Sequence, residues 1–306
     1  MKKAGALRRD LHLNGSLYLM VLPVVAFYIL FHYLPMSGVI IAFKNYKPAK
    51  GVFGSAWAGM GCFQHFHDFF TNYYFYRTLR NTLLINLYTL LFGFPAPIVF
   101  ALLLNEVKCR PFKRAVQTVS YFPHFISLVV VCGMLTEFCL SDGLFNQIRA
   151  LFGLSPKPLL QDPLLFRTIY VSSGVWQTVG WSSIVYLAAI AGIDQGLYEA
   201  AALDGAGRWR CMWHITLPGL KQTVVVLLIM QIGKMMNVSA DKIILLYNNS
   251  TMETADVISS YVYRRGLLEL NWSFSTAVGL FNSVINCALV VGANAMSRRL
   301  TESSLF

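Results

Sequence analysis

Charged side chains are scarce in this chain of 306 residues: they make up 13 % of it, against roughly 25 % in an average soluble domain. The hydrophobic share is correspondingly high, at 56 %. The mean hydropathy is +0.54, and this positive value also indicates an apolar chain. A composition this apolar indicates a protein whose surface is covered largely by lipid rather than by water.

The motifs of several common enzyme classes are also missing. The chain has no GxxxxGK phosphate-binding loop, no HExxH zinc motif and no GxSxG nucleophile turn. Its six cysteines show no CxxC spacing, and His65 and His67 form too weak a pattern for a metal site. Without a phosphate-binding loop, the chain lacks that route to binding and hydrolysing ATP. We expect a conduit rather than an enzyme, with no catalytic residue, metal or cofactor in this chain.

The net charge of +11 raises the question of nucleic-acid binding, which needs lysines and arginines clustered on one soluble face or groove. Here the basic residues flank long apolar segments instead. That placement favours a role in setting membrane topology and in contacting anionic lipid headgroups. We expect a lipid bilayer, and not a nucleic acid, as the partner of these charges.

Long apolar windows predict the fold. A transmembrane helix needs roughly 20 mainly apolar residues, and six windows meet or approach that length: 17–43, 82–104, 119–140, 169–193, 221–237 and 274–296. The fifth window is the shortest and carries Lys234 and Asn237 near its end. We predict an all-α integral membrane protein with six transmembrane helices. Its domain plan is a tail over 1–16, a transmembrane domain over 17–296 and a second tail over 297–306.

The distribution of basic residues predicts the orientation. Thirteen lysines and arginines lie in alternate segments, namely the N-terminal tail, 108–114, 208–221 and 298–299, and eleven lie in the longer segments between them. Basic residues near helix ends collect on the cytoplasmic side of a membrane. We therefore predict that both termini are cytoplasmic.

A polar and basic island over 194–218 separates the fourth window from the fifth. Asp194 can cap a short helix that has Glu199 in its early part, and acidic groups are favourable near a helix N-terminus. Ala200, Ala201 and Ala202 keep one face of this helix small, so that another surface can approach its backbone closely.

The second half of the island predicts a turn and a return helix. Gly205 permits the positive φ or tight turn that ends a helix. A second short helix over 208–215 then leads back to the membrane, with Pro218 in the first turn of the fifth span. The island is thus predicted to form a helix-turn-helix knob that faces the cytoplasm.

The island also resembles the EAA loop of binding-protein-dependent ABC importer permeases of the MetI-like family, in which this loop is the docking element for an ATPase. The matching positions, to which we assign ATPase coupling, are Glu199, Ala200, Ala201, Asp204, Gly205, Ile215, Leu217 and Pro218. The alternative is an ordinary connection with accidental alanines and glycines. The full register, placed after the fourth of six windows, favours the family.

Other segments are similar to the LplB-type permeases of the carbohydrate uptake branch: 9–44, 92–106, 116–127, 253–267 and 276–284. The resemblance implies half of a transporter of the MetI-like fold in the plasma membrane of a bacterium. It implies a second related permease, two ATPase subunits that bind ATP and Mg²⁺, and an extracytoplasmic solute-binding lipoprotein as partners. The implied cargo is an oligosaccharide or a polysaccharide fragment.

Polar side chains inside the windows are candidates for the solute path, because such groups usually face the bundle interior or a water-filled cavity. The candidates are Gln177, Trp176, Trp181, Gln231, Asn237, Asn282 and Asn286. The amides can equally serve as hydrogen-bonding contacts between helices. Lys234 can simply extend to the outer interface.

Two other functions stay open. An ABC importer for amino acids, phosphate or metal would share the loop but lack the LplB-like terminal segments. A secondary transporter would need coupling acids or inverted repeats in mid-membrane, and only Glu137 approaches a span, near its end. The sequence does not identify the glycan.

Overall fold

The computed structural model describes residues 13–301. This part of the chain consists of helices joined by turns, and its only β-pairing is an isolated bridge between Lys44 and Trp57. The predicted all-α fold class is confirmed. Of the two predicted tails, residues 1–12 and 302–306 lie outside the described residues, including the basic residues that the orientation argument places before residue 13.

The chain divides into two compact units. The first unit comprises 1–70 and 265–280, and the second comprises 71–264 and 281–306. The long helix α19 (Trp272–Thr301) contributes its first part to one unit and its remainder to the other.

The first unit begins with the apolar helix α2 (Gly15–Tyr28), which continues through short helical segments, including α3 (Leu34–Met36), as far as Phe43. After α4 (Gly51–Gly54), the chain forms α5 (Gln64–Thr71). The Phe69 ring of α5 meets Phe274 of α19 edge to face, with the ring centroids 6.1 Å apart. Burial of both rings attaches the start of α19 to this unit.

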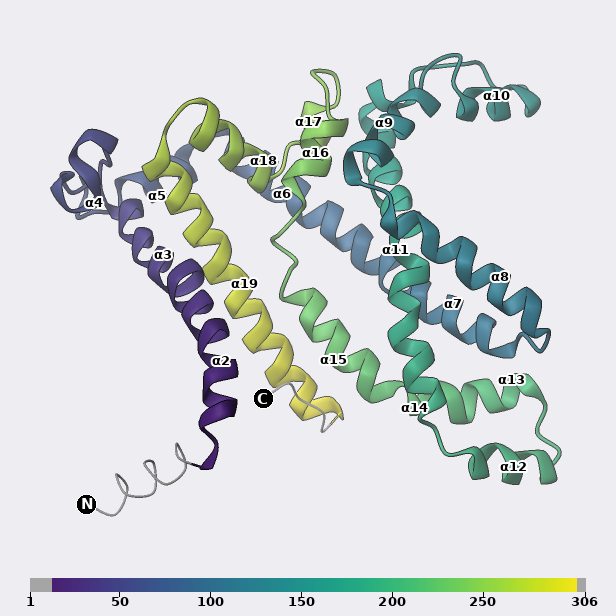
Figure 1. Cartoon of the computed structure of the whole chain (residues 1–306). Coiled ribbons are helices and arrows are strands. Elements are labelled where there is room, and N and C mark those ends of the chain that lie inside the picture. Colours follow the sequence, from purple (N-terminus) through teal and green to yellow (C-terminus); the bar gives the residue numbers. More distant parts are fainter. Residues whose placement is uncertain (1–12, 302–306) are drawn as a thin grey trace. The chain divides into compact units, whose positions relative to one another are not determined.

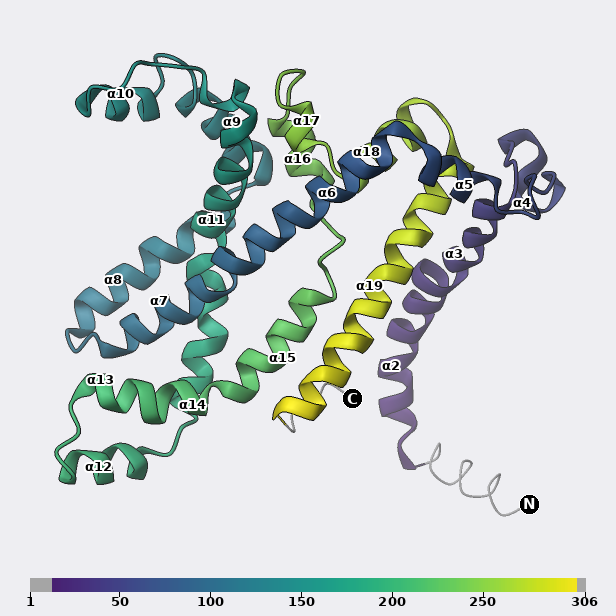
Figure 2. The same ribbon diagram turned by 180° about the vertical axis from the view of Figure 1, so that it is seen from behind.

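The second unit contains the remaining helices (Figures 1 and 2). They are α6 (Tyr73–Tyr88), α7 (Pro95–Glu106), α8 (Arg110–Tyr121), α9 (Leu128–Phe138), α10 (Leu144–Leu151), α11 (Pro163–Ala191), α12 (Gln195–Leu203), α13 (Arg208–Cys211), α14 (Leu217–Gly219), α15 (Lys221–Ile232), α16 (Ala240–Leu246), α17 (Met252–Ala255) and α18 (Ile258–Tyr263). In both views α10 lies at one end of α11, and α12 and α13 lie side by side at the other end.

The 29-residue helix α11 starts where its sequence specifies a start. Pro163 occupies the first turn, and Asp162 is the N-cap, with Oδ1 accepting a hydrogen bond from the amide of Leu164 at 2.9 Å. The Lys157 ammonium donates to the other carboxylate oxygen at 2.6 Å. Together these two bonds, the one from Lys157 first, hold the pKa of Asp162 below its usual value.

Prolines inside the long helices are accommodated by π-helical turns. Three such turns each end two residues before a proline: Ile29–Tyr33 before Pro35, Thr89–Gly93 before Pro95, and Met212–Thr216 before Pro218. A proline ring crowds the carbonyl four residues earlier, and in each case that carbonyl belongs to the π turn. The wider i→i−5 turn gives the ring room. At Pro35, Pro95 and Pro218 the backbone itself therefore accommodates the ring.

Three continuous helical stretches are long and apolar enough to cross a membrane: Gly15–Phe43, Tyr73–Glu106 and Trp272–Arg299. Two bent pairs pass the same test together: Arg110–Phe125 with Leu128–Phe138, bent by 99°, and Arg208–Gly219 with Lys221–Ile232, bent by 56°. The residues that the structure describes therefore hold three to five candidate spans, and α11 is not among them. Six spans stay a prediction.

The predicted third window, 119–140, does not form one helix. The chain turns sharply after Phe125, and Ser127 caps α9, its Oγ accepting from the amide of Val130 at 3.4 Å. The window holds the end of α8, a 3₁₀ turn that contains Pro123, and α9. Hydropathy does not reveal the bend, because the residues on both sides of it are apolar.

The fifth window, 221–237, differs at both ends. Its helix α15 stops at Ile232, and turns follow over 233–236. At the other end, Pro218 lies not in the first turn of this helix but inside the preceding helical stretch Arg208–Gly219, and the 56° bend comes after it. The π turn explains this placement, because it lets the earlier helix continue through the proline.

A buried ion cluster joins α6, α11 and the α17–α18 connection. The carboxylate of Asp256, which is fully buried, accepts hydrogen bonds from Arg264 at 2.8 and 2.6 Å and from Arg77 at 3.3 Å. Asn81 of α6 donates to the Asp256 carbonyl at 2.9 Å and accepts from Arg167 of α11 at 2.7 Å. These bonds satisfy the carboxylate away from water and hold the three segments together.

Helices α8 and α11 approach so closely at one point that only glycine fits. A Cβ atom at Gly180 would lie 2.3 Å from the carbonyl oxygen of Ser120, which is backbone and cannot rotate away. Gly133 in α9 is the opposite case, since a Cβ atom there would meet no atom within 4 Å.

We predict that Gly180→Ala destabilises the protein by about 1–3 kcal/mol, the range for overpacking a close contact. Gly133→Ala should be neutral or stabilising by up to about 1 kcal/mol, because alanine favours helix more than glycine does. The measurement is the midpoint of thermal unfolding of each purified variant in detergent. Equal midpoints for the two variants would contradict the close contact.

Candidate functional site

The segment that follows α11 folds as a separate helix, as predicted. Helix α12 starts after Asp194, whose Oδ1 accepts a hydrogen bond from the amide of Gly196 at 2.9 Å. This N-cap satisfies one of the free amides at the helix start. The predicted cap is therefore present in the structure.

Gly205 ends α12 in the way that its position predicts. It has a φ of +74°, in the left-handed region that favours glycine. The amide of Ala206 donates to the Ala201 carbonyl at 2.8 Å, and the Gly205 amide donates to the Ala202 carbonyl at 3.1 Å. This pair of bonds is a Schellman motif, which closes the helix and reverses the chain.

The chain returns through α13, the π turn Met212–Thr216 and α14. The Tyr198 hydroxyl lies 2.9 Å from Thr216 Oγ1, which ties the outgoing helix to the returning one. We call residues 194–219, which form this helix-turn-helix, the knob. In both views its helices α12 and α13 stand at one end of the second unit (Figures 1 and 2).

The knob exposes apolar side chains. Leu203, Trp209 and Trp213 are 90 %, 68 % and 61 % exposed. Exposed large apolar side chains become buried when a protein or lipid surface covers them. The eight predicted coupling residues all lie in this knob: Glu199, Ala200, Asp204, Gly205 and Pro218 are exposed, and Ala201, Ile215 and Leu217 are half-buried.

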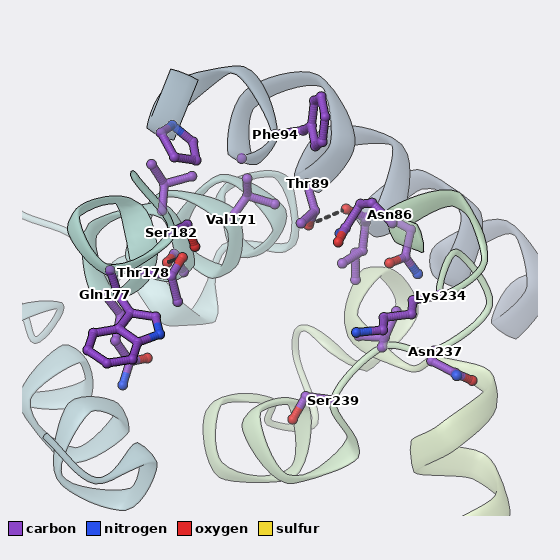
Figure 3. Close-up of a pocket in the computed structure, with 18 of the residues that line it drawn as sticks. Asn86, Thr89, Phe94, Val171, Gln177, Thr178, Ser182, Lys234, Asn237 and Ser239 are labelled. Carbon is purple, nitrogen blue, oxygen red and sulfur yellow. Dashed lines mark hydrogen bonds between the residues drawn. The ribbon is translucent and has the colours of Figure 1, made fainter. Parts of the chain in front are cut away.

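A cavity of about 660 Å³ lies inside the second unit (Figure 3). Its walls come from α6 and α7 with the π turn between them, from the middle of α11, from α15, and from the segment that leads into α16. The volume falls within the roughly 300–1,000 Å³ typical of small-molecule sites. The cavity is large enough to hold part of a solute.

Four of the seven predicted path residues line this cavity, and three do not. Gln177, Trp181, Gln231 and Asn237 are part of its wall. Trp176 is adjacent in sequence to Gln177 but lies outside the lining, as do Asn282 and Asn286 of α19. Gln177 and Trp181 are four residues apart in α11, and Asn282 and Asn286 are four apart in α19, so each pair shares a helix face. This spacing does not indicate which face borders open space.

The α19 asparagines bond to the connection that follows α15. Asn282 and Asn286 each donate to Asn237 Oδ1, at 2.9 and 3.1 Å. Asn286 Oδ1 in turn accepts from the amide of Met236 at 3.0 Å. These contacts correspond to the interhelical alternative that the sequence left open, and they satisfy backbone where α15 has ended.

An aromatic stack borders the cavity at Trp181. Its ring lies parallel to that of His124, with 4.6 Å between centroids and 4° between planes. Phe125 meets the same ring edge to face. Gln177 donates from Nε2 to the Ile126 carbonyl at 3.2 Å, so both side chains are held by the turn before α9.

The cavity has further polar wall residues that the sequence analysis did not single out: Asn86, Thr89, Thr178, Ser182, Ser239 and Lys242. For some of these residues, their spacing along a helix could have indicated that they line the cavity. Thr178 and Ser182 are four apart on α11, on the face that also carries Trp181. Lys242 gives no such signal, because a short helix outside the apolar windows carries it.

The family model described as the binding-protein-dependent transport system inner membrane component matches residues 93–302. The chain therefore belongs to this family of ABC importer permease subunits. It is a membrane protein and not an enzyme, and in such importers a separate subunit hydrolyses ATP.

Relatives resemble the chain over nearly its whole length. Protein LplB of Bacillus subtilis (strain 168) is 43 % identical over 99 % of this chain and 93 % of its own. The polygalacturonan/rhamnogalacturonan transport system permease protein YteP of the same organism is 43 % identical over 95 % and 90 %. A chain from the crystal structure of a bacterial ABC transporter that imports the acidic polysaccharide alginate matches with a TM-score of 0.88, 43 % identity, and coverage of 97 % and 99 %. The MetI-like fold is thereby confirmed.

We predict that Asn286→Ala lowers the thermal unfolding midpoint in detergent, by an amount equivalent to about 1–3 kcal/mol for a buried amide left unpaired. Gln231→Ala is the matched control, because its side chain lines the cavity and makes no hydrogen bond to another described residue. Its midpoint should stay at the wild-type value. A large loss for Gln231→Ala with none for Asn286→Ala would reverse the two roles.

Proposed function

We propose that this chain is one of two permease subunits of a bacterial importer that moves an oligosaccharide or a polysaccharide fragment across the plasma membrane. The knob carries the proposal. It is a capped helix closed by a glycine and pinned to the returning helix, with exposed apolar side chains, which suits a rigid element that seats in another protein.

The proposed partners follow from the role of the knob. Two ATPase subunits, which bind ATP and Mg²⁺, would receive the knobs of this chain and of a second related permease. Glu199, exposed on α12, would pair with a cationic group of the ATPase. An extracytoplasmic solute-binding lipoprotein would deliver cargo, and a relative's structure was determined in complex with an alginate pentasaccharide-bound periplasmic protein.

In this arrangement, ATP binding closes the ATPase dimer, and the knob passes the motion to α11 and α15, which it connects. Both helices line the cavity. A rigid-body change then exposes the cavity to alternate sides of the membrane. In this proposal, the knob and both termini would lie in the cytoplasm.

The cargo assignment rests on the cavity wall and on the relatives' names. Amides, hydroxyls and an indole ring line the cavity, and these groups bind sugars by hydrogen bonds and by contact with their apolar faces. Two of the relatives named above belong, by their names, to transporters of polygalacturonan and rhamnogalacturonan or of alginate. An importer of another solute would share the knob but have no reason for this wall.

The test is reconstitution of the complete complex in proteoliposomes, with its binding protein loaded in turn with a panel of oligosaccharides, amino acids and phosphate. ATPase stimulation and solute uptake should occur with at least one oligosaccharide. Stimulation by an amino acid or by phosphate, with none by any glycan, would refute carbohydrate import while leaving an ABC permease in place.

We predict that Gly205→Asp abolishes uptake while the protein still reaches the membrane. No atom lies within 4 Å of a Cβ built at this position, so the side chain itself has room, although its φ of +74° strains any residue other than glycine. The added charge would meet the ATPase. An unpaired charge in an interface costs several kcal/mol, so uptake should fall by about tenfold or more.

Gly205→Asn is the matched control, because asparagine has the same shape without the charge and tolerates a positive φ. It should keep much of the uptake. Wild-type uptake by Gly205→Asp, at equal amounts of protein in the membrane, would refute the coupling role.

A further inference from the structure

The cavity in the second unit has an unbalanced charge. Two lysines, Lys234 and Lys242, are in its wall, and none of the residues that line it is an aspartate or a glutamate. Apart from these two lysines, every lining side chain is neutral, with amides and hydroxyls among the polar ones. The wall thus carries a charge of +2 in a chain that is otherwise sparing with charge inside its bundle.

The two lysines differ in how they are held. Lys242 is only 6 % exposed, donates from Nζ to the Tyr170 carbonyl at 2.9 Å, and places Nζ over the Tyr170 ring, 4.6 Å from its centroid. Its head rests beside Gly174, where a Cβ would be 3.4 Å away. Lys242 is therefore part of the packed wall. Burial lowers the pKa of Lys242 to about 8, so that it still carries most of its positive charge at neutral pH.

Lys234 is the member of the pair whose side chain has no partner among the described residues. It follows α15 in the turns over 233–236, is exposed, and forms no ion pair or side-chain hydrogen bond with another described residue. Figure 3 shows its side chain extended into the hollow, on the side opposite Gln177 and Thr178. A lysine that merely extends to a membrane interface would not need to line this cavity.

An ammonium inside a bundle is costly unless something compensates its charge, and ionisable groups placed there usually belong to a solute pathway. Here the wall supplies donors and acceptors for hydroxyls but no anion. We propose that the cavity takes an anionic glycan, in which Lys234 binds the carboxylate of a uronate residue while the amides of Gln177 and Gln231 bind hydroxyl groups. This inference rests on the proposed import of a carbohydrate.

The positive charge of Lys242 adds to the preference of the cavity for an acidic sugar. Two positive charges in a cavity of low dielectric favour a carboxylate over a hydroxymethyl group at the same position of the sugar ring. A neutral glycan of the same length keeps its hydroxyl contacts but leaves Lys234 uncompensated. The cavity is therefore selective for charge and tolerant of the detailed sugar.

The test uses the complete complex with its binding protein in proteoliposomes and two matched probes. One is a trisaccharide of galacturonic acid, and the other is the same trisaccharide with its carboxyl groups reduced to hydroxymethyl groups. Uptake is measured for the wild type, Lys234→Gln, Lys234→Arg and Lys221→Gln. Lys221 starts α15, does not line the cavity, and controls for the loss of one charge.

The wild type should take up the acidic probe with the lower KM. Lys234→Gln should raise that KM by about tenfold to a hundredfold, the effect of losing one hydrogen bond to a charged group. It should leave uptake of the neutral probe unchanged. Lys234→Arg keeps the charge and should retain preference for the acid, and Lys221→Gln should behave as the wild type.

A wild-type complex that moves the neutral probe as well as or better than the acidic one, or a Lys234→Gln variant with an unchanged acidic KM, would overturn the anionic assignment and leave carbohydrate import intact. A wild-type complex that moves neither trisaccharide nor any other glycan, yet moves another solute, would instead overturn carbohydrate import. The two failures are therefore distinguishable.

Discussion

The absence of water from a bilayer interior is the constraint on which this structure depends. Every backbone amide and carbonyl in that region needs a partner within the protein, because an unpaired group there costs several kcal/mol. The π turns before Pro35 and Pro95 meet this requirement by local widening of the helix. Asn286 meets it where α15 stops, by accepting from the amide of Met236. In both cases a partner within the protein compensates the departure from regular helix.

The same constraint separates the two parts of the proposed transport machinery. The knob exposes Leu203, Trp209 and Trp213, which suits a docking surface at the end of the second unit. The cavity lies deeper in that unit, and its polar wall is permitted only because it borders open space. Helices α11 and α15 connect them: α11 ends just before the knob and α15 begins just after it. Under the proposed coupling, motion of the knob would therefore reach two walls of the cavity.

Local features of the fold could be predicted from the sequence where a single residue determines the backbone. Asp194 and Gly205 specify the start and end of α12, and both appear in the structure with the expected geometry. The 99° bend within 119–140 could not be predicted in this way. Apolar residues lie on both sides of the bend, and the mean hydropathy of a window is the same whether its helix is straight or bent. Similarly, helical spacing grouped Gln177 with Trp181 and Asn282 with Asn286. Only tertiary packing shows that the first pair borders the cavity while the second pair bonds to Asn237.

The central claim is that the cavity opens to opposite sides of the membrane under control of the ATPase. It can be tested with one cysteine at position 231, in a complex whose native cysteines are replaced, using a membrane-impermeant maleimide applied to either face. We predict labelling from the cytoplasmic face in the resting complex, and from the opposite face once a nonhydrolysable ATP analogue and loaded binding protein are present. Labelling from the same face in both states would contradict the account.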